Sequence, residues 1–271
     1  MHKAWSILVL VLAMVGMPLV AFAADQKTTP PAEIDRLIKR MEDSGALDAA
    51  IDRGMQRYLQ RQKEAQQKQQ EEQKRAQAEA AKNARAVDIN RDHIFGSQQA
   101  DVSVIVYDDL ECPFCKRFAG TPEQAIAKFH GKANVVFRHY PLDIHGEMAR
   151  RGAYYAECVG RQAGSKAFFA FANDWFRLTS SNGKGFERGN AQIAEIAQSA
   201  GVKDLAALDA CVRDPAVAQL VRDDKADAAK GGITTAPGVI VRNNKTGLSL
   251  STFGSVPVEA LEQVIQKALA N

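Results

Sequence analysis

An apolar stripe with helical spacing occupies residues 32–59 of the chain. Its members recur at steps of three and four residues, which is the spacing of one face of an α-helix. They are Ile34, Leu37, Ile38, Met41, Leu47, Ile51, Met55, Tyr58 and Leu59. Ser44 and Gly45 are expected to divide the stretch into two helices. Because no local core accompanies the stripe, it should either dock onto the rest of the chain or pair with copies of itself. We favour self-association, within an oligomerisation segment at residues 24–59.

The stripe ends abruptly, and residues 60–86 carry no apolar face. These 27 residues include eight Gln, seven Ala, seven Lys or Arg and four Glu, and none is Leu, Ile, Val, Met or Phe. Such strong helix formers favour a solvated helical spacer, about 40 Å long if it is fully helical. A disordered linker is the alternative, since the segment has nothing with which to build a core.

Residues 87–271 have the pattern of a globular α/β domain. A run of β-branched residues predicts a buried strand at 102–107, followed by a turn at 108–111. A helix should open at Cys112 and continue to about His130, and several helices should fill an insertion from about 146 to 230. The other expected elements are strands at 135–140, 239–241 and 248–253, a turn at 235–238 and an amphipathic helix at 257–269.

Residues 1–23 have the features of a secretory signal peptide. A short basic start is followed by an uncharged, mostly apolar run from Ile7 to Val20 and by the small-x-small site Ala21-Phe22-Ala23. A permanent membrane anchor is the alternative, but the run is slightly short for a span. Cleavage would release an exported protein into an oxidising compartment, which is the periplasm in a Gram-negative bacterium.

Composition narrows the classes of function. The chain is 46% hydrophobic and 25% charged, which is an ordinary globular balance. It has 35 Lys and Arg against 32 Asp and Glu, and a formal charge of +3 gives little support for a nucleic-acid binder. Four cysteines are too few for a scaffold built on disulfides, so the chemistry of particular pairs becomes the question.

Two of the cysteines form a Cys-x-x-Cys motif between a predicted strand and a predicted helix. Cys112 should lie at the helix N-terminus, where unpaired backbone N–H groups and the helix dipole favour an anion and lower the pKa of a thiol. Pro113 suits the first helical turn because its missing N–H costs nothing there. Cys115 follows one turn later. Cys112 would therefore attack a substrate disulfide, and Cys115 would resolve the mixed disulfide.

Other interpretations of the motif are weaker. A structural zinc site usually needs four ligands, commonly in two close pairs, whereas Cys158 and Cys211 are widely separated. A purely structural disulfide between Cys112 and Cys115 would close too short a loop to contribute much unfolded-state entropy. A non-enzymatic copper-handling or chaperone protein could use the two sulfurs as soft ligands. We expect neither a metal nor another cofactor.

With these elements in this order, the chain resembles the DsbA-like branch of the thioredoxin superfamily. The likeness covers about residues 93–271 and rests on Phe95-Gly96, Glu111-Cys-Pro-Phe-Cys-Lys-Arg-Phe118, Phe137-Arg-His-Tyr-Pro-Leu142 and Ala156-Glu-Cys158. It implies a thioredoxin fold with an inserted helical subdomain, and the activity of a thiol:disulfide oxidoreductase. The N-terminal helical stalk is similar in layout to oligomeric ScsC-type and DsbC- or DsbG-type relatives.

The resemblance also implies a role for the loop at Thr235, Ala236 and Pro237. Pro237 would be a cis-proline facing Cys112 and Cys115, in a loop that offers backbone groups to an extended substrate. An ordinary trans turn is the alternative. Many relatives carry Thr directly before this proline, so Ala236 removes a hydroxyl beside the active sulfur and should change partner preference and redox tuning.

Residues around the motif favour a weak oxidant. The strongly oxidising relatives resemble Cys-Pro-His-Cys, in which the His helps to stabilise the thiolate, whereas Phe114 offers neither a donor nor a charge. Asp108, Asp109 and Glu111 add negative charge that opposes a thiolate, with a partial offset from two basic neighbours. A disulfide isomerase or reductase is therefore favoured, and a DsbA-like dithiol oxidase is the alternative.

Cys158 and Cys211 both lie in the predicted helical insertion, 53 residues apart. A structural disulfide between them would stabilise the fold by about 4 kcal/mol through loop entropy, and two buried free thiols are the alternative. The expected partners are exported clients that contain cysteines, a membrane redox partner that reduces or oxidises the motif, and further copies of the chain. No nucleic acid is expected.

Overall fold

The computed structural model describes residues 31–270, apart from the side chain of Phe253. The signal peptide predicted at residues 1–23 lies outside the described residues. The chain divides into two compact units, Met1–Ala65 and Gln66–Asn271. None of the helices between residues 31 and 270 combines the length and the apolar character needed to cross a bilayer.

In the first unit the apolar stripe lies on two helices and is exposed. Helix α1 (Pro31–Asp43) is followed at Ala46 by the start of α2 (Ala46–Ala81). The break falls at Ser44 and Gly45, where Gly45 has a φ of +66°. Eight large apolar side chains here are between 42% and 59% exposed: Ile34, Leu37, Ile38, Met41, Ile51, Met55, Tyr58 and Leu59. In the structure the polar segment is helical as far as Ala81.

The second unit is built on one five-stranded sheet with the order β1-β3-β2-β4-β5. Its strands are β1 (His93–Gly96), β2 (Val102–Asp108), β3 (Ala133–His139), β4 (Gly238–Asn243) and β5 (Ser249–Phe253). Only β2 and β3 run parallel; every other pairing in this sheet is antiparallel. The central strands β2 and β3 are buried throughout. Strand β1 was not predicted, because four residues show too little alternation to be recognised.

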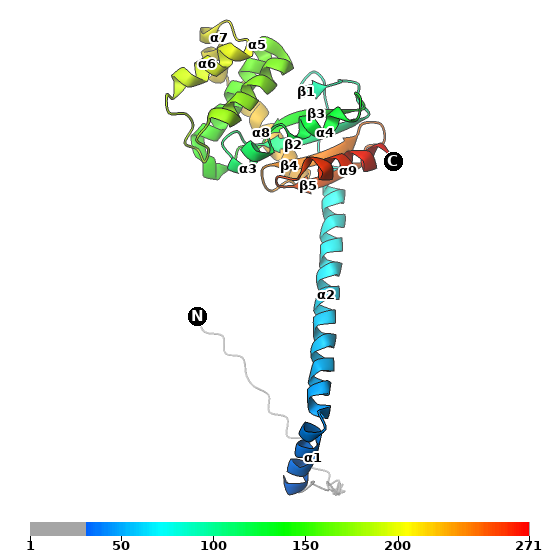
Figure 1. Cartoon of the computed structure of the whole chain (residues 1–271). Coiled ribbons are helices and arrows are strands. Elements are labelled where there is room, and N and C mark those ends of the chain that lie inside the picture. The colour runs from blue at the N-terminus through cyan, green and yellow to red at the C-terminus, as the bar shows by residue number, and fades with distance from the viewer. Residues whose placement is uncertain (1–30, 271) are drawn as a thin grey trace, which may run out of the picture. The chain divides into compact units, whose positions relative to one another are not determined.

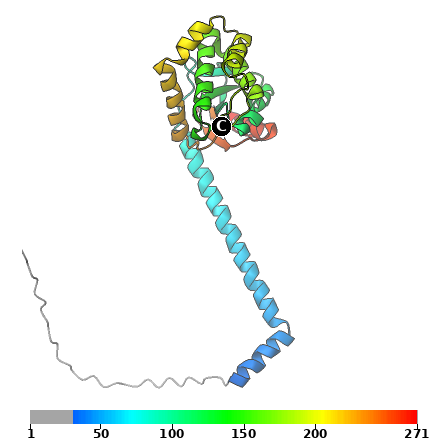
Figure 2. The same ribbon diagram turned by 90° about the vertical axis from the view of Figure 1, so that its left-hand side faces the viewer.

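Helices cover both faces of this sheet and form the insertion (Figures 1 and 2). They are α3 (Pro113–Phe118), α4 (Thr121–Ala127), the 3₁₀ helix η1 (Asp143–His145), α5 (Gly146–Leu178), α6 (Asn190–Ala200), α7 (Leu205–Val212), α8 (Pro215–Lys230) and α9 (Val258–Leu269). Helices α5, α6 and α7 gather beside the sheet, whereas α4 and α9 pack together against it.

The single helix predicted from Cys112 to His130 is wrong. Helix α3 ends at Phe118 and α4 begins at Thr121. Gly120 between them has a φ of +81°, which is a left-handed conformation that glycine adopts without strain. Pro122 then lies in the first turn of α4, where a residue without an N–H is tolerated.

Alternate residues of β2 enter two different cores. Val104 and Val106 pack on one face with α3, α5 and α9, and this larger core holds the fully buried Trp175. Ile105 and Tyr107 pack on the other face with α8 and with two alanines, Ala81 and Ala84. Both alanines are buried, so the domain starts earlier than the boundary expected between residues 86 and 87.

A buried network of charges holds residues 85–92 to this second face. Arg138 is fully buried on β3, and its guanidinium donates to Asp92 at 3.0 Å and to Asp227 of α8 at 2.8 Å. Arg85 bridges Asp92 and Asp224. Arg138 also donates to the backbone carbonyls of Arg85 and Ala86. The end of the polar segment is therefore part of the folded domain.

Candidate functional site

Cys112 is the N-cap residue of α3, directly after the turn that leaves β2. Its φ of −79° and ψ of 125° are extended, Pro113 is the first residue of the helix, and the Cys112 carbonyl accepts from Lys116 N at 2.9 Å. Both cysteines of the motif are free thiols; Cys112 is 2% exposed and Cys115 is completely buried. The strand and the helix thus place the Cys112 sulfur at a helix N-terminus.

The two thiols have opposite acidities. A hydrogen bond from the Cys115 thiol is the main reason that the pKa of Cys112 falls to about 6. Burial and the charge of Asp109 oppose this shift, while the backbone N–H groups of Phe114 and Cys115 assist it. Burial raises the pKa of Cys115 well above its usual value. Near neutral pH, Cys112 is therefore the thiolate and Cys115 the thiol.

The loop at Thr235, Ala236 and Pro237 lies against this sulfur. The Ala236–Pro237 peptide bond is cis, and the Cys112 sulfur lies 3.6 Å from the Ala236 carbonyl oxygen. Ala236 and Pro237 are buried, whereas Thr235 is exposed. The structure therefore brings together two segments that are 124 residues apart in the sequence.

Phe114, the variable residue inside the motif, lies on the surface. Its side chain is 54% exposed, and the Arg117 guanidinium lies 4.4 Å from the centre of its ring. It contributes a flat apolar surface beside Cys112 and no side-chain donor for the thiolate. The neighbouring Lys116 ammonium donates to the Thr179 carbonyl at 2.7 Å, so this charge is directed toward the insertion.

Glu111 was expected to crowd the approach to the thiolate with negative charge, and the structure directs its carboxylate elsewhere. Glu111 is completely buried, and its carboxylate accepts hydrogen bonds from Trp175 Nε1 at 2.9 Å, Thr179 Oγ1 at 2.7 Å and Gly185 N at 3.1 Å. The carboxylate therefore faces the helical insertion. Glu111 positions the 179–185 loop beside the motif, a role that depends on partners more than 60 residues away.

Asp109 holds a second loop. Its carboxylate accepts from Leu142 N at 2.8 Å and lies 2.6 Å from His145 Nδ1. The two loops meet at Gly183, because a Cβ added to that glycine would lie 2.5 Å from the His145 carbonyl oxygen. Asp109 and Glu111 thus each hold one of two loops that contact the turn before Cys112.

Asp108 lies beneath the cysteine pair, at the end of β2. It is buried, it contacts the Cys115 thiol, and burial raises its pKa to about 7. The sequence showed only an acid next to an apolar strand, and we expected it to act on the thiolate from the approach side. Its position beside Cys115 places a carboxyl group next to the buried thiol.

Cys158 and Cys211 are joined by a disulfide in the structure. It links α5 to α7 with a Cα–Cα distance of 5.8 Å, and Cys158 is completely buried. Both ends lie within the insertion, so this disulfide belongs to its packing. Between residues 31 and 270, no group of three or more His, Cys, Asp or Glu side chains is arranged to hold a metal ion.

Comparison with protein families identifies the second unit. The family model described as Thioredoxin matches residues 88–267. The chain belongs to this thioredoxin family. The matched residues include all five strands of the sheet, the Cys-x-x-Cys motif and the loop at Pro237.

Solved structures place the chain among DsbA-type proteins. DsbA2 of Pseudomonas aeruginosa is 31% identical, with a TM-score of 0.56 over 68% of this chain and 96% of DsbA2. BdbD of Bacillus subtilis is 20% identical, with a TM-score of 0.57 over 69% of this chain and 98% of BdbD, and at that identity it supports the fold alone. The chain has a DsbA-like thioredoxin fold with an inserted helical subdomain, and it is a thiol-disulfide oxidoreductase.

A periplasmic thioredoxin-like protein of Salmonella enterica serovar Typhimurium also shares the fold. It is 19% identical, with a TM-score of 0.54 over 67% of this chain and 91% of that protein. Among curated proteins, the Na(+)/H(+) antiporter NhaA 1 of Mycolicibacterium gilvum is 35% identical over 81 residues. That match spans 30% of this chain and only 13% of the antiporter, so it relates one short region of the two proteins.

Proposed function

We propose that the protein exchanges disulfides of exported client proteins in the periplasm, and that it acts as an isomerase or reductase more than as a net oxidant. The observation that carries this proposal is the opposite acidity of the two thiols in one motif. Cys112 has the low pKa of an attacking thiolate. Cys115 has the high pKa of a thiol that stays protonated until it attacks the mixed disulfide.

The proposed cycle begins when the Cys112 thiolate attacks one sulfur of a client disulfide. The client disulfide breaks, its other sulfur leaves as a thiolate, and Cys112 and the client are joined in a mixed disulfide. In isomerisation a client thiolate attacks this bond and restores Cys112. In reduction, Asp108 accepts the Cys115 proton and Cys115 attacks Cys112. The client departs reduced by two electrons, and the motif is left as a disulfide that a thiol reductant must regenerate.

The loop around Pro237 supplies the binding site in this proposal. An extended client segment would pair with the exposed backbone near Thr235, beside the sulfur of Cys112. Ala236 has no hydroxyl, so recognition here depends on the backbone and on apolar contact. Phe114 provides such a surface on the other side of Cys112, since more than half of its side chain is exposed.

The degree of acidity favours the isomerase or reductase direction. A strongly oxidising DsbA thiol has a pKa of about 3.5, whereas thioredoxin has a value of about 7. The pKa of Cys112, about 6, lies between them and nearer to thioredoxin. A less stabilised thiolate gives a less stabilised reduced form and hence a weaker oxidant. Burial of the thiolate and the charge of Asp109 keep the pKa of Cys112 from falling further, and Phe114 offers no side-chain donor that would lower it.

Self-association through residues 32–59 completes the proposal. The eight exposed apolar side chains of the first unit form a stripe, and the exposure of this apolar surface to water is unfavourable. Residues 31–65 contain seven Lys or Arg and seven Asp or Glu, a balanced set that gives no electrostatic attraction to anionic lipid. A second copy of the same stripe is therefore the best-matched occupant, and oligomers would present several motifs to one client.

A refolding assay with a scrambled-disulfide substrate tests the proposal on the full-length protein. We expect the wild type to restore native pairing in a thiol buffer, and Cys112→Ser to have no activity. Cys115→Ser should retain part of the reshuffling, because isomerisation does not require the second sulfur. If the protein fails to reshuffle but rapidly oxidises reduced dithiols, it is an oxidase of the DsbA type.

A further inference from the structure

The outer face of α3 carries a cation that no carboxylate of this chain neutralises. Arg117 lies in the last turn of α3 and is exposed. Its guanidinium lies over the Phe114 ring, 4.4 Å from the ring centre, and Phe114 is itself 54% exposed. Among the described residues, this contact with the ring is the only interaction of the Arg117 side chain.

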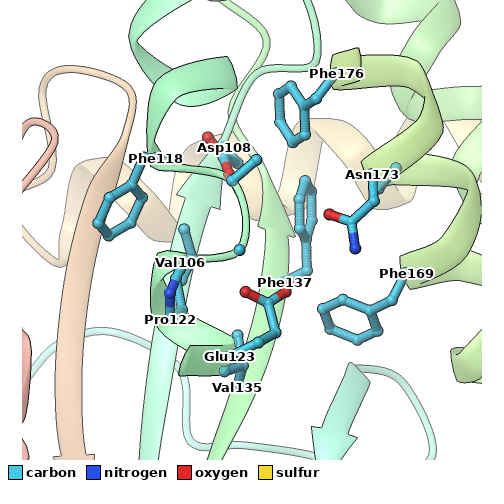
Figure 3. Close-up of a pocket in the computed structure, with 13 residues that line it drawn as sticks. Val106, Asp108, Phe118, Pro122, Glu123, Val135, Phe137, Phe169, Asn173 and Phe176 are labelled. Carbon is cyan, nitrogen blue, oxygen red and sulfur yellow. The ribbon is translucent and has the colours of Figure 1, made fainter. Parts of the chain in front are cut away.

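The packing of α3 fixes this face outward. Phe118, which follows Arg117, is fully buried and borders the pocket behind the motif (Figure 3). Cys115 is also fully buried. These two side chains hold the inner face of the helix against the core. Phe114 and Arg117 are three residues apart on the opposite face, so they are neighbours on the surface.

Contact with the ring leaves the donors of Arg117 available. A guanidinium over an aromatic face is attracted to the ring, while its N–H groups point outward in the guanidinium plane. Such a group can bind a carboxylate through two parallel hydrogen bonds. The ring also restricts the side chain before any ligand arrives, so less conformational entropy is lost on binding.

The acids near the motif do not cancel this charge. Asp108 borders the same internal pocket (Figure 3), and the carboxylates of Asp109 and Glu111 are buried and hydrogen-bonded to other segments. Helix α3 has no acidic residue, and its last turn contains two basic residues, Lys116 and Arg117. The charge that α3 presents beside the exchanging sulfur is therefore positive.

We propose that Arg117 is a specificity-determining residue, and that it selects client segments with a carboxylate side chain close to the exchanging cysteine. This inference rests on the proposed function and names the class of client that the site prefers. Phe114 holds the guanidinium in place, and the Arg117 donors bind the Asp or Glu side chain of the client.

The reach of Arg117 sets the position of this acid in the client. An α-helix rises about 1.5 Å per residue, so Arg117 lies about 7.5 Å along α3 from Cys112. An extended client advances about 3.3 Å per residue. One arm of the client pairs near Thr235, and the other arm passes over Phe114. A residue two positions from the client cysteine on that arm reaches Arg117, and it points to the same face as the cysteine.

The test is the attack of the reduced full-length protein on three peptides. Each peptide has one cysteine, joined in a disulfide to a neutral 2-thiopyridyl group, and carries Glu, Gln or Lys two residues away on each side. Cys112 forms a disulfide with the peptide sulfur, and the thiopyridine leaves with the electron pair and absorbs light. We expect the Glu peptide to react about fivefold faster than the Gln peptide, the upper end for an exposed ion pair. The Lys peptide should be slowest, and salt should reduce these differences.

Variants assign the preference to one side chain. Arg117→Gln should react with the Glu and Gln peptides at equal rates, and Arg117→Glu should prefer the Lys peptide. Arg213→Gln is the matched control, because it makes the same chemical change at an exposed position at the end of α7. It should keep the fivefold preference for the Glu peptide.

Two results overturn the inference. One is a wild type without preference, or a preference for the Glu peptide that survives in Arg117→Gln. The other is an equal fall in rate with all three peptides, which would show that Arg117 acts on the helix or on Cys112 and not on the client. Failure of the proposed function has a different signature: the wild type would then release thiopyridine from none of the peptides faster than Cys112→Ser does.

Discussion

Three acidic residues precede Cys112 closely in the sequence, and each has a different set of neighbours. Asp108 contacts Cys115, Asp109 holds the loop that contains His145, and Glu111 holds the 179–185 loop. The charge of Asp109 raises the pKa of Cys112, and the charge of Cys112 in turn raises the pKa of Asp108. Asp109, which also holds the loop of Leu142 and His145, therefore opposes the Cys112 thiolate directly.

Asp109→Asn should lower the pKa of Cys112 below about 6, because the charge that opposes the thiolate is removed while an oxygen still accepts from Leu142 N. The measurement is the rate of alkylation of Cys112 against pH. Glu111→Gln is the control: it should weaken the 179–185 loop and leave the midpoint of the titration in place. A rise in the Asp109→Asn midpoint would contradict the argument.

The same pKa links the stability of the reduced protein to pH. A thiol in an unfolded chain has a pKa of about 8.5, and the pKa of folded Cys112 is about 6. Because the folded value is the lower one, the thiolate contributes stability that is complete above a pH of about 8.5 and is lost as the pH falls through about 6. The melting temperature of the reduced form should therefore rise relative to the disulfide form between those limits. Cys112→Ser should abolish the difference in slope.

At the scale of elements, the sequence pattern predicted most of the strands and the C-terminal helix. It did not predict where one helix ends and the next begins, or which residues of the polar segment are buried. Strand β2 is a run of β-branched residues and helix α9 has a clear helical periodicity, so the existence of both could be predicted. The break at Gly120 has signals, namely a glycine and a following proline, but a single long helix has similar periodicity. The burial of Ala81 and Ala84 has no signal at all, since alanine fits both a solvated helix and a core.

The site was predictable to a similar extent. The nucleophile followed from the position of Cys112 between a strand and a helix, and its meeting with Pro237 followed from the family resemblance. The direction of Glu111 could not be predicted, because it depends on Trp175 and Gly185, which tertiary structure alone brings close.

Arg138→Met tests the network that fastens residues 85–92 to the sheet. Removing the guanidinium leaves Asp92 and Asp227 buried without their main partner, and breaking a buried ion pair in this way costs about 3–5 kcal/mol. Urea unfolding measures the change in free energy. Arg150→Met, at an exposed pair with Glu147, should cost less than about 1 kcal/mol. Equal losses in the two variants would show that the buried network contributes little.

At the scale of the whole molecule, we assign self-association to the first compact unit and disulfide exchange to the second. The first presents an apolar stripe that has no local core, and the second contains the complete motif with its cis-proline loop. Reshuffling of a client benefits from several motifs within reach of one substrate, whereas simple dithiol oxidation needs one motif. The assembly of the first unit should therefore affect the two activities differently.

Ile51→Glu with Met55→Glu places two charges in the stripe of the full-length protein. We expect the mass in solution to fall to that of a monomer, together with a loss of reshuffling and no loss of simple dithiol exchange. Light scattering and the scrambled-substrate assay measure the two effects. Gln56→Glu adds a charge at an exposed polar position of the same helix and should change neither. A monomeric wild type would remove the basis for self-association.

The two loops held by Asp109 and Glu111 have a consequence for which clients the protein can serve. The loops lie so close at Gly183 and the His145 carbonyl that no Cβ would fit between them, and we expect this packing to limit their movement beside Cys112. When a client binds, the conformational change must then occur in the client. A finished protein, whose disulfides are held inside rigid structure, cannot present a bent strand to such a site, whereas a wrongly paired one can. We expect a site of this kind to select immature over mature clients by their flexibility, with no recognition of sequence.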